Sequence, residues 1–194
     1  MDFNFVPWGN AYYAKVTGNT TYDRGPGMTA WLQTCGMGVT NPPEGCFEGT
    51  ILCQHGENEC KSNLIEGCVK DALKDNAADY WPFMHCYEGQ GVDRINPDSP
   101  TKALDACVSK VGLSSSTVAA VKSCVASPTS SQAVLSKNAA LTAALVPAHE
   151  GTPWILVNGK SFSGVRRRRR RDCPRSRHRL HAMLLSLVSR ALQV

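Results

Sequence analysis

The sequence has no Cys-x-x-Cys pair, although nine of its 194 residues are cysteines. A dithiol redox site needs such a pair at a helix N-terminus, where the helix dipole lowers the pKa of the first thiol and the second thiol resolves the mixed disulfide. The sequence also has no apolar run long enough to span a membrane. Met1 leads into Asp2-Phe3-Asn4-Phe5, which does not resemble the basic and then apolar start of a signal peptide. These absences exclude Cys-x-x-Cys catalysis by this chain and predict no transmembrane segment.

The cysteines are concentrated in the first two thirds of the chain. An even number there predicts disulfides and an oxidising compartment, and on the order of a hundred pairings are open. The single glycosylation sequon, at Asn19, is consistent with a secretory route. The disulfide candidates are Cys35, Cys46, Cys53, Cys60, Cys68, Cys86, Cys107 and Cys124.

Charge divides the chain into two parts. Residues 165–194 hold ten arginines and one acid, Asp172, so they carry a net charge of +9. Residues 1–164 hold 11 basic and 15 acidic side chains, a net charge of −4. We therefore expect a body over residues 1–162 and a basic tail over residues 163–194 that contains a short amphipathic helix. The abrupt change suggests a shifted reading frame or misplaced splice junction, and a genuine basic tail is the alternative.

The hydrophobic pattern predicts mostly helices after residue 57. Residues 3–8 alternate like a β-strand, and residues 11–50 read as loop with a short hairpin because they are rich in Gly, Pro, Thr and Asn. Apolar residues recur at helical spacing over residues 60–73. Further helices are expected after caps at Ser99-Pro100, Ser116 and Ser130-Ser131. Residues 154–157 read as a strand that ends in an Asn158-Gly159 hairpin turn.

The most informative stretch is 53-CQHGENECKSNLIEGC-68. Zinc sites usually pair their ligands as C-x₂₋₄-C, and the gaps here of one, four and seven residues do not fit that pattern. A redox site would need the absent Cys-x-x-Cys. The residues therefore favour a structural role, in which Cys60 and Cys68 on the apolar helix face, with Cys53 ahead of it, attach the helix to its surroundings.

This stretch resembles the signature C-Q-H-G-x₂-E-C-x₂-N-x₄-C of the gamma-interferon-inducible lysosomal thiol reductase family. The segments 6-VPWGNA-11 and 147-PAHEGTPWILVNGK-160 are also similar to that family, so the resemblance covers roughly residues 1–162. The signature positions are Cys53, Gln54, His55, Gly56, Glu59, Cys60, Asn63 and Cys68.

The resemblance implies an α/β, thioredoxin-like fold with a helical insertion at about residues 58–146. It also implies that the first strand and the active-site helix, which carries the catalytic Cys-x-x-Cys in the family, are missing from this chain. Thr152 and Pro153, joined by a cis peptide bond, would belong to the substrate-facing loop. We assign no catalytic role to the neighbouring His149-Glu150, and we expect no catalytic residue, metal or cofactor in the chain.

Three functional hypotheses remain open. The first is an incomplete member of a family that reduces protein disulfides at acidic pH, in endolysosomes or outside the cell, with this chain itself inactive. The second is a non-catalytic isoform that binds the same disulfide-containing clients. The third is that Arg166–Arg171 bind an anionic partner. Because no aromatic residues are interleaved with the arginines to stack on bases, we do not expect that partner to be a nucleic acid.

Overall fold

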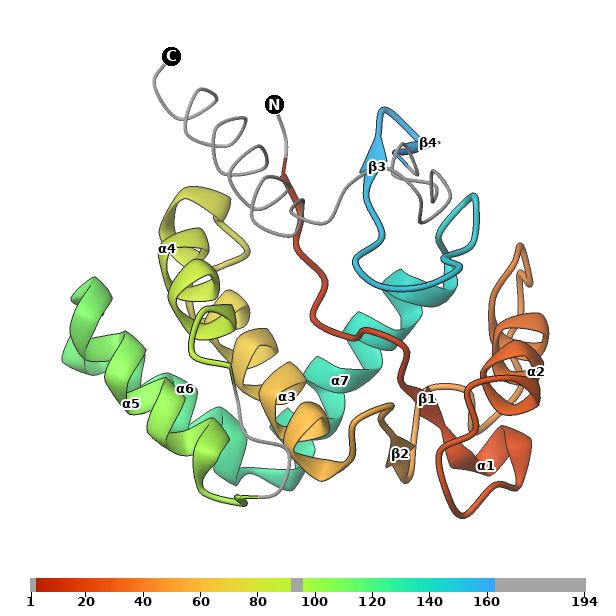
Figure 1. Ribbon diagram of the computed structural model, residues 1–194, viewed down its shortest axis with the longest axis horizontal. Coiled ribbons are helices and arrows are strands. Elements are labelled where there is room, and N and C mark those ends of the chain that lie inside the picture. The colour runs from red at the N-terminus through yellow and green to blue at the C-terminus, as the bar shows by residue number, and fades with distance from the viewer. Residues whose placement is uncertain (1–2, 92–95, 163–194) are drawn as a thin grey trace, which may run out of the picture. The chain divides into compact units, whose positions relative to one another are not determined.

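A computed structural model describes residues 3–91 and 96–162 (Figure 1). Residues 4–153 form one compact unit, called here the helical unit. The described residues of the second unit are Phe3 and residues 154–162. The basic tail and the helix predicted in it lie outside the described residues.

The described chain is mostly helical and has two small antiparallel sheets of two strands each. The order is β1 (Tyr12–Tyr13), α1 (Ala14–Thr17), α2 (Pro26–Cys35), β2 (Ile51–Leu52), α3 (Glu57–Ala72), α4 (Ala77–Glu88), α5 (Ser99–Val111), α6 (Ser115–Ala126), α7 (Pro128–Ala143), β3 (Leu156–Val157) and β4 (Lys160–Ser161).

Helix α3 is the centre of the helical unit. It packs against α4, α5, α6 and α7, and Figure 1 shows it among them. One face buries Ile65 and Val69 against apolar side chains of α4, α5 and α6. On another face Gly67 allows α7 to approach, because a Cβ there would lie 2.4 Å from a methyl carbon of Val134. The helix predicted from the hydrophobic period is therefore present as the main core element.

A second core surrounds β1 and α2. Trp8, Tyr12, Tyr13 and Trp31 are all fully buried there, and the Trp31 Nε1–H donates to the carbonyl of Cys46 at 2.9 Å. The prediction of loop with a short hairpin over residues 11–50 was wrong, since this region contains β1, α1 and α2, and β1 pairs with β2 just beyond it. These elements are short, and they are stabilised by burial of aromatic side chains and by pairing across the chain (Tyr12 opposite Leu52), which local composition does not reveal.

The strand predicted for residues 3–8 was also wrong, because no strand is assigned to residues 3–8. Residues 4–8, drawn in red in Figure 1, run beside α3 and α7, and side chains from these helices bind their backbone. The Phe5 N–H donates to the Tyr80 hydroxyl at 3.1 Å, and Asn63 donates to the carbonyl of Trp8 at 3.0 Å. Alternation alone cannot distinguish a sheet strand from an extended segment satisfied in this way.

Three predicted helix starts shift by one to three residues. Helix α5 begins at Ser99 with Asp98 as its N-cap, so Ser99 is not the cap. Ser114 caps α6 by accepting from the Thr117 N–H, and Ser127 caps α7 in the same way. In each case another residue ahead of the predicted serine takes the cap position.

In the second unit, Asn158 and Gly159 connect β3 to β4, as the sequence predicts. Both have positive φ (50° and 72°), the conformation that a two-residue type I′ turn requires. Only residues 156 and 157 of the predicted strand over 154–157 pair in the sheet. The thioredoxin-like sheet is not among the elements of the described residues, so that part of the fold prediction is not shown.

Candidate functional site at the start of helix α3

The signature segment forms a short covalent loop that leads into α3. Cys53 and Cys60 are disulfide-bonded, with their Cα atoms 5.7 Å apart and seven residues apart in sequence. Between them Gly56 is the N-cap of α3 and has φ +86°, a conformation that L side chains rarely adopt. The glycine of the signature is thus explained by the sharp entry of the chain into the helix.

Glu59, in the first turn of α3, binds the loop residue His55. Its Oε2 accepts a hydrogen bond from the His55 N–H at 2.6 Å and lies 3.0 Å from Nδ1 of the same histidine. An acid in the first helical turn also interacts favourably with the helix dipole. Both side chains are partly exposed, so this ion pair contributes little to the free energy of unfolding. Its main role is to hold the loop conformation.

Two other signature side chains hold residues 8–10 against the start of α3. Gln54 accepts from Asn10 Nδ2 at 2.7 Å, and Asn63 is the donor to the Trp8 carbonyl described above. The polar residues of the signature therefore join the two family-like segments, 6–11 and 53–68, in space. This geometry gives them positioning roles and brings no nucleophile among them.

The eight cysteines of residues 1–164 form four disulfides, which confirms the disulfide-rich body expected from the cysteine count. Spacing alone left the pairing open. The pairs are Cys35–Cys46, Cys53–Cys60, Cys68–Cys124 and Cys86–Cys107. The zinc alternative needs thiolates, and each signature cysteine has its sulfur in one of these bonds.

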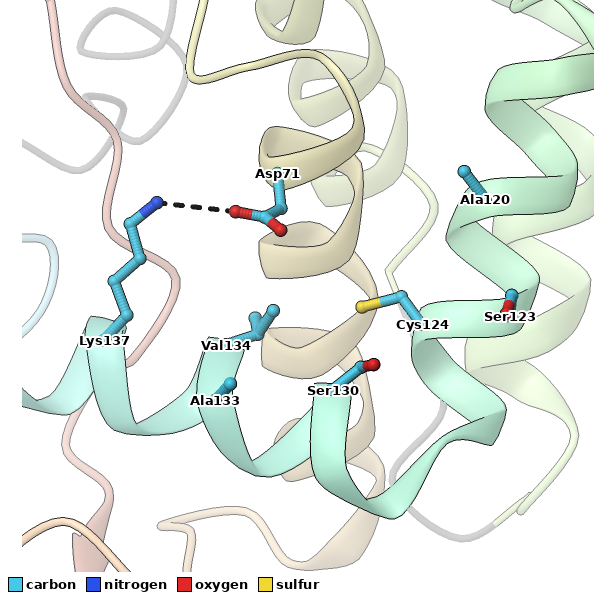
Figure 2. A pocket seen from close by; sticks show the side chains of 8 residues that line it. All are labelled: Asp71, Ala120, Ser123, Cys124, Ser130, Ala133, Val134 and Lys137. Atoms are coloured by element: carbon cyan, nitrogen blue, oxygen red, sulfur yellow. Dashed lines mark ion pairs between the residues drawn. The ribbon is translucent and has the colours of Figure 1, made fainter.

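The Cys68–Cys124 bond attaches α6 to the central helix next to a surface groove (Figure 2). The groove lies between α3, α6 and α7 and has a volume of about 470 Å³. Asp71 and Lys137 form an ion pair of 3.5 Å across it. Cys124, the disulfide partner of the signature residue Cys68, lines the groove. The lining residues do not include any of residues 53–60, so the groove lies apart from the loop at the start of α3.

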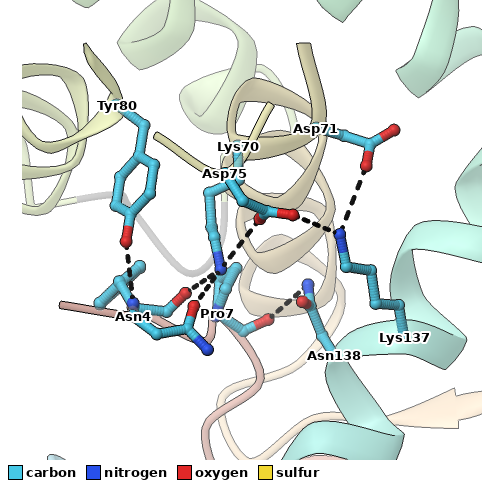
Figure 3. Close-up of polar contacts among 9 residues, drawn as sticks. Asn4, Pro7, Lys70, Asp71, Asp75, Tyr80, Lys137 and Asn138 are labelled. Carbon is cyan, nitrogen blue, oxygen red and sulfur yellow. Dashed lines mark hydrogen bonds and ion pairs between the residues drawn. The ribbon is translucent and has the colours of Figure 1, made fainter. Parts of the chain in front are cut away.

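A buried lysine on α3 holds the N-terminal segment of the helical unit (Figure 3). Lys70 is 3% exposed, donates to Asn4 Oδ1 at 2.9 Å and also donates to the Phe5 carbonyl. Its ammonium group lies 3.6 Å from Asp75 and 5.4 Å from the centre of the Tyr80 ring. Burial lowers the pKa of Lys70, and the nearby Asp75 only partly opposes that shift.

The same helix buries a carboxyl group, Glu66, at the contact with α4. Burial, and then the carboxyl of Glu88, raise the pKa of Glu66 well above its ordinary value. Sequence reasoning missed both Glu66 and Lys70. The available signal was two ionisable residues four positions apart on the apolar face of α3. That spacing suggests an ion pair between them, whereas in the structure Glu66 lies near Glu88 and Lys70 donates to Asn4 and Phe5.

The remaining candidate residues are placed as follows. The Thr152–Pro153 peptide bond is cis, and both residues are exposed at the end of the helical unit. His149 is buried, and burial lowers its pKa. At the sequon, Asn19 Nδ2 already donates to the Tyr12 hydroxyl at 3.0 Å. The substrate-facing role of the loop and the glycosylation of Asn19 stay predictions.

Within residues 3–91 and 96–162, no helix is long and apolar enough to cross a membrane. The same residues contain no cluster of three or more His, Cys, Asp or Glu side chains placed to hold a metal ion. What the described geometry defines is a helical domain with four disulfides and a signature loop that organises its central helix.

Comparison with known proteins identifies the family. The family model described as gamma interferon inducible lysosomal thiol reductase matches residues 28–111. The chain belongs to this family, as the signature residues indicated.

Three curated relatives agree with this assignment. A gamma-interferon-inducible lysosomal thiol reductase of Carassius auratus is 37% identical over 160 residues, which is 82% of this chain and 47% of the relative. The protein of the same name from Mus musculus is 30% identical over 160 residues, 82% of this chain and 48% of the relative. A gamma-interferon-responsive lysosomal thiol protein of Arabidopsis thaliana is 34% identical over 111 residues, 57% and 41% of the two chains. The chain thus spans about half the length of the curated relatives it matches.

Proposed function

We propose that this chain is part of a thiol–disulfide oxidoreductase that reduces disulfide bonds of protein substrates in an acidic endolysosomal or extracellular setting. The observation that carries the proposal is the family signature, in which Gly56 and Glu59 shape the loop at the start of α3 and Asn63 binds the Trp8 carbonyl. The names of the relatives, which describe lysosomal thiol reductases, support the same class of chemistry and the same compartment. A thioredoxin-like fold, with the helices of residues 58–146 as an insertion, belongs to this proposal.

In this proposal the 194 residues alone do not catalyse reduction. A reductase needs a thiolate that attacks the substrate disulfide and a second thiol that releases the product. The sequence has no Cys-x-x-Cys, and the eight cysteines of the helical unit are bonded to each other. The exposed Thr152 and Pro153 then serve to bind substrate.

The same observations support a second candidate, a non-catalytic protein that binds disulfide-containing clients. It makes the same claim about the substrate-facing loop and differs only in predicting binding without turnover. An anionic partner of the arginine-rich tail is a weaker alternative, because the tail lies outside the described residues and no further observation favours it.

One experiment tests these ideas together. The purified chain is added to a denatured, disulfide-containing protein at pH 4.5–5.5 with a low-molecular-weight thiol, and new substrate thiols are counted. The mouse relative serves as the positive control. We expect the chain to add nothing to the rate of the small thiol, and to bind the client in a parallel pull-down that Thr152→Lys weakens. Catalytic turnover would refute the inactivity of the chain, and no binding would remove the client-binding role.

A further inference from the structure

The four disulfides differ in how far an external thiol can reach them. In two of them both cysteines are buried: Cys35 with Cys46, and Cys86 with Cys107. The second of these is also covered by Gln90, whose Nε2 lies 3.7 Å and 3.6 Å from its two sulfurs. Thiol–disulfide exchange requires direct approach of a thiolate to a sulfur atom, so these two bonds are protected while the protein stays folded.

The other two disulfides each have one partly exposed cysteine. Cys60 is partly exposed and its partner Cys53 is buried, and Cys124 is partly exposed beside the groove of Figure 2 while its partner Cys68 is buried. Residue exposure therefore leaves these two bonds as the candidates for attack by a small thiol, and the Cys60 sulfur additionally lies 3.8 Å from the Ile51 carbonyl oxygen.

Helix position separates these two bonds. Cys60 is the fourth residue of α3, so the Cys53–Cys60 bond lies at the first turn of a 16-residue helix, where the dipole favours negative charge. Cys124 lies in the last turn of α6, where the dipole disfavours a thiolate. The negative charge of Glu57, in the first turn of α3, opposes the stabilisation of a thiolate at the start of this helix. Glu59, in the same turn, pairs with His55 at 3.0 Å.

The consequences of breaking the two bonds also differ. The Cys53–Cys60 bond closes seven residues, and that loop is also held by the Gln54–Asn10 and Glu59–His55 contacts. The Cys68–Cys124 bond closes 56 residues and attaches one helix to another. Because the entropy that a cross-link removes from the unfolded chain grows with loop length, opening the shorter loop leaves the fold more nearly intact.

We propose that the Cys53–Cys60 disulfide is a redox modification site that low-molecular-weight thiols open while the helical unit stays folded. A thiolate RS⁻ attacks Sγ of Cys60, an RS–S bond forms, and the Cys53–Cys60 bond breaks with its electron pair leaving on the Cys53 sulfur. A second RS⁻ attacks the mixed disulfide at the R sulfur, which releases RSSR and the Cys60 thiolate. Two thiols are oxidised, one protein disulfide is reduced, and the protein thiolates take up protons from solvent according to their pKa.

The test is the order in which the four bonds open in the unmodified chain. The oxidised protein is incubated at pH 7 with dithiothreitol for increasing times and quenched with N-ethylmaleimide. The remaining disulfides are then reduced and labelled with iodoacetamide, so mass spectrometry gives the open fraction of each pair. We expect Cys53 and Cys60 to react at least tenfold faster than the other three pairs, with unchanged circular dichroism during that phase.

Two results would overturn the proposal. One is earlier opening of Cys68–Cys124, and the other is simultaneous opening of all four bonds with loss of helix. As a matched variant, Cys53→Ser with Cys60→Ser should remove the fast phase and leave the slow phases unchanged. If that variant does not fold, the order measured in the unmodified chain still decides the question. No protein substrate is present, so the outcome is independent of the proposed reductase or client-binding function.

Discussion

Glu66 should make the stability of the helical unit depend on pH, and Glu66→Gln should remove that dependence. The carboxyl group is 2% exposed, and its Oε1 has no hydrogen-bond partner among the described residues. On α4 it faces Glu88 and Tyr87, neither of which is a cation. Lys70, four residues along α3, is bound to Asn4 and Phe5. Glutamine has nearly the shape of the protonated acid and cannot ionise.

Burial and the nearby Glu88 raise the pKa of Glu66 in the folded state, so the folded protein binds a proton that the unfolded chain releases. Stability from this group is fully present below the unfolded pKa of about 4.3 and is lost as pH rises through the folded pKa. Between the two values the free energy of unfolding falls by about 1.4 kcal/mol per pH unit for one retained proton. For a chain of this size that corresponds to about 3–5 °C in Tm per pH unit.

The assay is thermal unfolding followed by circular dichroism from pH 4 to pH 8, in the unmodified chain, in Glu66→Gln and in a surface control, Glu44→Gln. The quantity of interest is the difference between variants, because other groups that titrate in this range cancel in it. We expect Glu66→Gln to match the unmodified protein near pH 4 and to exceed it increasingly towards neutral pH. Parallel curves for the two proteins would show that Glu66 is not a buried proton acceptor and would refute the reasoning.

Three further predictions concern other parts of the helical unit. Replacing Cys68 and Cys124 together by serine should lower the free energy of unfolding by about 4 kcal/mol, from the loop-entropy relation for 56 residues, as measured by urea denaturation; a loss below about 1 kcal/mol would contradict the cross-linking role. Lys70→Ala should cost about 3 kcal/mol by the same assay, because it removes the charge-assisted hydrogen bonds that this buried side chain donates to Asn4 and Phe5. Lys122→Ala, an exposed control, should change stability little. Because burial lowers the pKa of His149, its imidazole should titrate below the usual range in histidine NMR spectra, and an ordinary or raised value would show that the side chain is not buried.

Local sequence patterns predicted the elements that local interactions can stabilise. The apolar period over residues 60–73 predicted α3, because one face of a long helix must be buried in the core. Asn158-Gly159 predicted the turn between β3 and β4, because both positions need positive φ. The signature at residues 53–68 predicted the family, because many specified positions at fixed spacing are improbable by chance.

Tertiary structure decided what depends on distances between remote parts of the chain. The pairing of Cys68 with Cys124 follows from how α6 packs on α3, and spacing alone cannot select one pairing among the many that are open. Residues 3–8 alternate like a strand, yet Lys70 and Asn63 bind their backbone carbonyls in place of a neighbouring strand. Glu66 gains its raised pKa only where α4 covers it, because desolvation and the nearby Glu88 arise from packing and are not encoded in any local pattern.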